Sequence, residues 1–167
     1  MNSLAATNRY TFSSLMSLLI QTEGKMKEFY ERTDKEISQE ETRAHFKQCA
    51  RNSSRRIDLM QKARVERVME MTLEPITDLN LTDLITRFTD ILQDRNIRPL
   101  EKAVSLEKTI SELYARTYPR IMQTSPDTGE LLIELSHESL ERQKELERYV
   151  RSLQHNINQR SPEHALS

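Results

Sequence analysis

Apolar side chains recur every third or fourth residue along most of the chain, which is the period of an α-helix rather than of a strand. The pattern predicts long helices at 9–36, 39–73, 99–122 and 127–155. The connecting segment 76–98 is too long for a simple turn and is predicted to contain a short amphipathic helix. The segments 1–8 and 157–167 lack the helical period and are predicted to be tails. We therefore predict one all-α domain over 9–156.

Capping and turn residues locate several of the predicted helix ends. Ser38 with Glu41, and Asp127 with Glu130, have the spacing of capping boxes that would start the second and fourth long helices. Pro99 is a favoured first-turn residue for the third. The first two long helices are joined by a short link, and so are the last two, which makes each pair antiparallel. A single long crossover joins the two pairs.

Stepping along each long helix by alternating threes and fours gives one inward-facing seam per helix. The seams of the first and third helices each contain one charged residue, Glu23 and Glu107. A tyrosine follows seven residues later in each, at Tyr30 and Tyr114. Because the two helices match at equivalent places, the chain contains an internal duplication.

The seams of the second and fourth long helices carry a second matched pair. Both read Ser-x-x-Arg, at Ser53 and Arg56 and at Ser139 and Arg142. Sliding the register by one residue would instead turn Arg55, Glu138, Glu141 and other charged residues inward. That register is rejected because it buries many unpaired charges.

The matched glutamates and tyrosines resemble a known family. Ferritin-like carboxylate proteins hold two metal ions with one Glu on each of two helices and a Glu-x-x-His on each of the other two. Over about 10–153 the chain is similar to the rubrerythrin branch of that superfamily, through Glu23, Tyr30, Glu107 and Tyr114. The resemblance implies a ferritin-like antiparallel four-helix bundle with one long crossover, carrying a short helix, between its second and third long helices.

The remaining metal positions of that family are replaced in this chain. Ser53 and Ser139 stand where the family has Glu, and Arg56 and Arg142 stand where it has His. Arginine offers only donors, so it cannot supply a lone pair to a metal. Two arginines can neutralise the two seam glutamates, so the six positions predict a buried salt-bridge cluster with no metal and no other cofactor. The competing interpretation is that both arginines reach out of the core to solvent.

Composition narrows the function classes. The 25 basic and 26 acidic residues give a net charge of −1, which provides no field for binding nucleic acid. The most apolar N-terminal stretch is only about half of the length that a membrane span needs, so no span is predicted. The single Cys49 is predicted to be a buried side chain rather than a redox centre, and a cytoplasmic location is expected. The four histidines fall outside the seams.

These observations lead to three hypotheses for function. The first is a non-catalytic ferritin-like protein that has lost its diiron site and acts as a structural, interaction or accessory subunit, with a homodimer as the expected form of self-association. The alternative is a rubrerythrin-type metal-dependent oxidoreductase, a peroxidase or ferroxidase, whose unusual site uses Glu23, Glu107 and Glu138 or Glu141. The third is a pocket between the helices that binds a small anion through Arg56 and Arg142.

Overall fold

The computed structural model describes residues 9–67 and 75–160. This part of the chain has an all-α fold, as predicted. The helices are α1 (Phe12–Glu36), α2 (Glu40–Arg67), α3 (Thr82–Gln93), α4 (Pro99–Thr124) and α5 (Pro126–Arg160). Within the described residues, extended pairing is limited to one isolated antiparallel bridge between Tyr10 and Ile76. The predicted tail at 1–8, the predicted end of the second helix at 68–73 and the last seven residues lie outside the described residues.

The helix ends differ from the prediction by a few residues. α1 begins at Phe12 rather than at residue 9, because Thr11 and Ser14 form a reciprocal cap in which each side chain accepts from the backbone N–H of the other. α2 begins at Glu40, one residue after its predicted start. Helical hydrogen bonding also continues past Pro119 to the end of α4.

α5 departs most from the predicted bounds. It begins at Pro126, so Asp127 lies inside the first turn and is not the capping residue that was predicted. A proline suits that first position, since its missing N–H would have no helical partner there. At its other end α5 continues to Arg160, which makes 157–160 helical rather than part of a tail.

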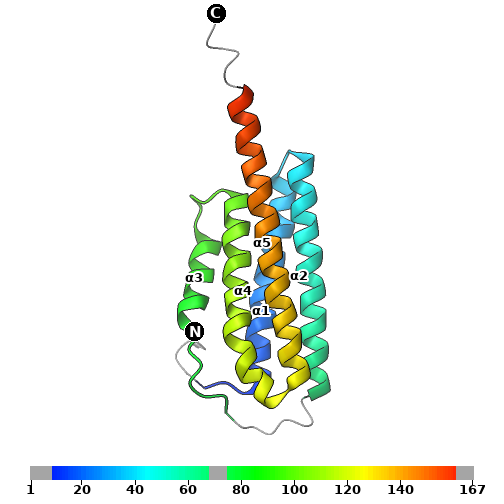
Figure 1. Cartoon of the computed structure of the whole chain (residues 1–167), viewed down its shortest axis with the longest axis vertical. Coiled ribbons are helices and arrows are strands. Elements are labelled where there is room, and N and C mark those ends of the chain that lie inside the picture. Colours follow the sequence, from blue (N-terminus) through cyan, green and yellow to red (C-terminus); the bar gives the residue numbers. More distant parts are fainter. Residues whose placement is uncertain (1–8, 68–74, 161–167) are drawn as a thin grey trace, which may run out of the picture.

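The four long helices lie side by side along the long axis of the molecule (Figure 1). α1 and α5 run upward in this view, whereas α2 and α4 run downward. The most extensive packing is of α4 on α5 and of α1 on α2, and smaller contacts join α1 to α4 and α2 to α5. The described part of the segment between α2 and α4, residues 75–98, runs along the length of the molecule, with α3 packed on the outer side of α4.

The predicted seams form the core. The predicted seam residues named above are fully buried, except that Arg142 is half-buried: Glu23, Tyr30, Ser53, Arg56, Glu107, Tyr114 and Ser139. α4 and α5 approach closely near their shared turn, where a Cβ on Gly129 would lie 2.8 Å from the Cα of Met122. The seam spacing therefore assigned the inward faces correctly.

The apolar face of α3 covers the long helices. Leu84 and Phe88 are buried in the main core, with Ile91 and Leu92 packed against it. Salt bridges from Arg116 to Asp83 (2.5 Å) and from Arg87 to Glu112 (2.7 Å) fasten the exposed side of α3 to α4. Among the described residues, no helix is long and apolar enough to cross a membrane.

Candidate functional site

Two buried glutamates form the centre of the site. Glu23 on α1 and Glu107 on α4 are the only charged residues in their seams, and both are completely buried. A buried carboxylate is stable only where donors or opposite charge surround it. The surroundings of these two side chains therefore determine what the site can do.

Arg56 on α2 supplies the opposite charge and is also completely buried. Its Nη1 donates to Oε1 of Glu23 at 3.0 Å and to Oε2 of Glu107 at 3.3 Å. Its Nε donates to Oε1 of Glu138 at 3.2 Å, on α5. One guanidinium thus contacts carboxylates from three other helices.

Two tyrosines complete the hydrogen bonding of the glutamates. Tyr30 Oη donates to Oε1 of Glu107 at 2.8 Å, and Tyr114 Oη donates to Oε2 of Glu23. Each tyrosine therefore serves the glutamate of the other half of the duplication. Together with the two contacts of Arg56, these bonds give each of the four carboxylate oxygens one donor.

The fully buried charges do not sum to zero. One guanidinium faces two carboxylates, and the third carboxylate, Glu138, is 30% exposed. Burial raises the pKa of Glu107 above its usual value of 4.5, although Arg56 acts in the opposite direction. A proton on one carboxylate would remove the excess negative charge, so the raised pKa agrees with the arrangement of the charges.

Tyr30, Tyr114 and Arg56 stay in their usual charge states. Burial, together with the charge of the nearby glutamate, holds the pKa of Tyr30 and of Tyr114 well above 10, which keeps both as hydrogen-bond donors. Burial disfavours the charged form of Arg56, but the adjacent carboxylates outweigh this effect and hold its pKa well above the usual value. Burial also raises the pKa of Cys49 to about 12, so this thiol is a poor nucleophile.

Arg142 does not join the cluster, which corrects the prediction of two paired arginines. Its side chain is 14% exposed and donates to Glu145 on its own helix at 2.8 Å. Nη2 of Arg142 also donates to the amide oxygen of Asn52 on α2, at 2.7 Å, when that amide is oriented with its oxygen toward α5. Arg56 alone already contacts both glutamates, whereas burying a second guanidinium would add a further desolvation cost.

The two seam serines lie in the core but hydrogen-bond to none of these groups. Ser53 and Ser139 are completely buried, and neither Oγ has a partner among the described residues. Nη2 of Arg56 is in the same condition. These polar atoms mark a polar region inside an otherwise apolar interior.

Glu138 and Arg55 also belong to the site, although the seam spacing places both outside the core. Glu138 accepts from Arg56 through one oxygen and from Arg55 through the other. Burial acts to raise the pKa of Glu138, but the hydrogen bond from Arg55 and the charges of Arg56 and Arg55 outweigh it, so this pKa is lowered. Because Glu138 lies next to Ser139 on α5, its long side chain reaches the edge of the core although its backbone position does not face inward. That adjacency was the available signal.

The residues present do not fit the dinuclear metal centre of the family that the sequence resembles. Every oxygen of Glu23 and Glu107 already accepts from a donor, and the guanidinium of Arg56 lies between the two carboxylates. The serines and Arg142 provide neither of the missing Glu-x-x-His pairs. Within the described part of the chain, no group of three or more His, Cys, Asp and Glu side chains is arranged to hold a metal ion.

Comparisons of this chain with protein-family models, with curated proteins and with solved structures find no match.

Proposed function

We propose that this chain is a ferritin-like four-helix bundle, similar to rubrerythrin, in which a buried ionic cluster replaces the dinuclear metal centre. Two features support the proposal. The order and directions of α1, α2, α4 and α5, with one long crossover, agree with ferritin-like connectivity. The repeated Glu and Tyr positions meet at one level of the core, joined by their reciprocal hydrogen bonds.

On this proposal the protein acts without metal, as a structural, interaction or accessory subunit that binds other protein chains. The observation that carries it is the donor given to each oxygen of Glu23 and Glu107, with Arg56 between them. A metal ion would have to displace both tyrosine hydroxyls and the guanidinium to reach the carboxylates. Its charge would also be repelled by a fixed cation, since arginine stays protonated.

Elemental analysis of protein purified without chelators tests this proposal. We expect less than one equivalent of iron, manganese or zinc per chain, and neither peroxidase nor ferroxidase activity after incubation with ferrous iron. Two tightly held ions per chain would contradict the proposal. A variant with both buried glutamates changed to glutamine (Glu23→Gln with Glu107→Gln) serves as the control, because metal that remains bound to it must lie elsewhere.

One observation favours the alternative, a metal-dependent oxidoreductase. Glu23, Glu107 and Glu138 all contact Arg56, so three carboxylates would surround the space left if this side chain moved away. Glu141, the other ligand considered, is exposed and pairs with Lys144 instead. Metal uptake by the wild-type chain that is lost in Glu138→Gln would support this alternative, because Glu138 is the carboxylate nearest to solvent.

A further inference from the structure

α5 carries its apolar stripe beyond the level at which the other long helices end. Leu146, Val150, Leu153 and Ile157 follow one another by steps of four, three and four, the spacing by which helices pair in coiled coils. Exposure rises along the stripe, from the fully buried Leu146 to Ile157, which is 65% exposed. Figure 1 shows this end of α5 extending past its neighbours. The seam that fills the core therefore continues onto the surface.

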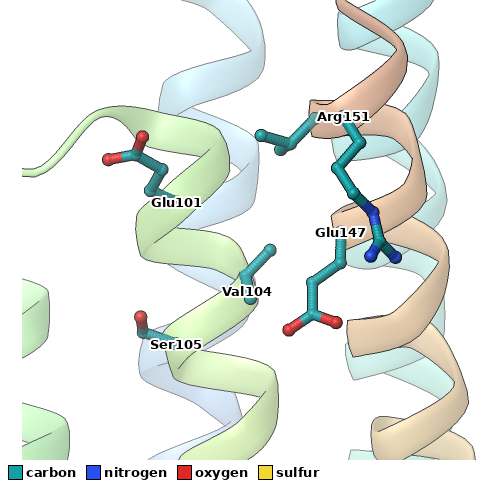
Figure 2. Close-up of a pocket in the computed structure, with 6 residues that line it drawn as sticks. Glu101, Val104, Ser105, Glu147 and Arg151 are labelled. Carbon is teal, nitrogen blue, oxygen red and sulfur yellow. The ribbon is translucent and has the colours of Figure 1, made fainter. Parts of the chain in front are cut away.

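A groove runs from this end of the molecule down between α4 and α5. Its lower part has a volume of about 520 Å³, with Val104 on α4 opposite Glu147 and Arg151 on α5 (Figure 2). Its upper part has a volume of about 400 Å³ and is also bordered by residues 36–39, at the α1–α2 link, and by Thr42 of α2. The apolar side chains that line it include Ile37, Pro99, Leu100, Val150, Leu153 and Ile157. Glu101 and Val150 line both parts, so we treat them as one surface, the α4–α5 groove.

The charges of this surface are divided between the groove and the end of α5. From Arg148 to Arg160 the helix carries three arginines and no acidic residue. The other charged residues that line the groove are three glutamates and one arginine: Glu36, Glu101, Glu147 and Arg98. One chain thus holds both a basic apolar helix end and an acidic apolar groove, which is the condition for a self-complementary contact.

We propose that the α4–α5 groove binds the α5 end of a second copy of this chain, in a two-fold symmetric dimer with the two α5 helices antiparallel. This inference rests on the proposed function, because it names the partner and the surface through which the protein would act. Val150, Leu153 and Ile157 of each copy pack between the helices, and Arg160 of each copy approaches Glu147 of the other. The dimer then covers the stripe that a single copy leaves exposed.

The first test measures the molar mass of the full chain by light scattering and sedimentation equilibrium at tens of micromolar. We expect a dimer, weakened in about 1 M NaCl because salt screens the arginine–glutamate contacts. Ile157→Glu and Leu153→Glu should each raise the dissociation constant at least about tenfold. Val65→Glu is the matched control, since Val65 is 73% exposed on α2 and lies outside the groove. Circular dichroism of each variant shows whether it has folded.

A monomeric wild-type chain would overturn the inference and leave the groove to the C-terminal segment of the same chain or to a different protein. A dimer unaffected by both glutamate variants would overturn it as well, because the contact would then lie elsewhere. A positional test uses Gln154→Cys, which places a thiol beside the proposed two-fold axis while the native Cys49 stays buried. Mild oxidation should link this variant into dimers, and Val65→Cys should remain unlinked. Equal linking of the two would count against the groove.

The same samples separate this inference from the proposed function. Metal bound at the buried glutamates would contradict the proposed function whatever the molar mass. A metal-free monomer would overturn the dimer alone.

Discussion

The hydroxyl of Tyr30 on α1 donates to Oε1 of Glu107 on α4, at 2.8 Å, inside the core. The equivalent bond runs the other way, from Tyr114 to Glu23, so the duplication appears in space as two reciprocal bonds between the halves of the chain. Each bond supplies one of the two donors that a buried carboxylate receives. The two tyrosines should therefore be of similar importance, although they lie in different helices.

We expect Tyr30→Phe and Tyr114→Phe each to lower the free energy of unfolding by about 1 to 3 kcal/mol, because each leaves a buried carboxylate oxygen without its donor. Tyr118→Phe is the control: Tyr118 is only half-buried, and the donors to the two glutamates are Tyr30, Tyr114 and Arg56. Chemical denaturation at neutral pH measures all three. A loss confined to one of the two buried tyrosines would show that the reciprocal bonds are not equivalent in energy.

The central guanidinium should matter more than either hydroxyl. Arg56→Ala leaves the buried carboxylates without their cation and should reduce the free energy of unfolding by about 3 to 5 kcal/mol. Arg55→Ala is a matched control, since the side chain of the adjacent Arg55 is 53% exposed and pairs with Glu138 rather than with the two buried glutamates. Its loss should cost less than about 1 kcal/mol, as is usual for surface pairs.

Replacing the whole cluster separates the value of the pair from the cost of breaking it. The triple variant Glu23→Leu, Arg56→Met, Glu107→Leu removes the buried charges together with their desolvation cost, so its stability should equal or exceed that of the wild type. It should therefore exceed that of Arg56→Ala by about 3 to 5 kcal/mol. Denaturation midpoints compare both variants and the wild type directly. A triple variant less stable than the wild type would mean that the ionic cluster stabilises the fold beyond its cost of burial.

The pH dependence of stability tests the raised pKa of Glu107. A carboxyl that holds its proton to higher pH in the folded chain than in the unfolded chain stabilises the fold below its usual pKa of 4.5. This contribution is lost as the pH rises through the folded-state pKa. The unfolding free energy of the wild type minus that of Glu107→Gln should therefore fall as the pH rises from about 4.5 toward 7, by at most about 1.4 kcal/mol per pH unit.

The exposed Glu134 provides the control for this profile. The unfolding free energy of the wild type minus that of Glu134→Gln should stay constant over the same pH range. Glu138 has a lowered pKa and therefore acts below 4.5, outside this window. A difference that grows with pH above 4.5 would mean that attraction to Arg56 outweighs the burial of Glu107.

Seam spacing and side-chain chemistry were enough to predict that Glu23, Arg56 and Glu107 form buried salt bridges, but not that Arg142 would stay outside the cluster. The spacing placed Glu23, Arg56 and Glu107 inside because the helical period leaves no other inward face for the apolar residues around them. It treated Arg56 and Arg142 as equivalent because they occupy equivalent positions in the two halves. Arg56 reaches both carboxylates while Arg142 pairs with Glu145 on its own helix, and which arginine reaches them depends on three-dimensional proximity rather than on sequence spacing.

The reciprocal tyrosine bonds and the role of Glu138 also required the structure. Periodicity in one helix gives no information on the distance to another helix, so the partner of Tyr30 could not be chosen from the pattern alone. Glu138 was excluded by its register, yet a side chain of this length can cross from a flanking position to the edge of the core. Helix ends differed where caps decided them, as at Thr11.

Rebuilding the missing ligands tests both the register and the proposed ancestry of the site. The changes Ser53→Glu, Arg56→His, Ser139→Glu and Arg142→His place a Glu-x-x-His on α2 and on α5, facing Glu23 and Glu107. They also remove the guanidinium that lies between the carboxylates. Four carboxylates and two imidazoles then form a dinuclear ligand set, and the variant should bind two iron or manganese ions per chain.

The affinity of the rebuilt site for metal is expected to be modest, because the four changes do not add the hydrogen-bond partners that orient metal-binding imidazoles. Loss of such partners commonly lowers metal affinity by about 10- to 100-fold. The control carries the same motifs on exposed faces: Asp58→Glu and Gln61→His on α2, and Lys144→His three residues after the native Glu141 on α5. Elemental analysis and the visible absorption of bound iron distinguish the two variants. If the inward variant folds and binds no metal while the outward one does, the inward-facing seams do not correspond to the ligand positions of a ferritin-like bundle. Two ions in the inward variant alone would mean that four side chains separate this core from a dinuclear metal site.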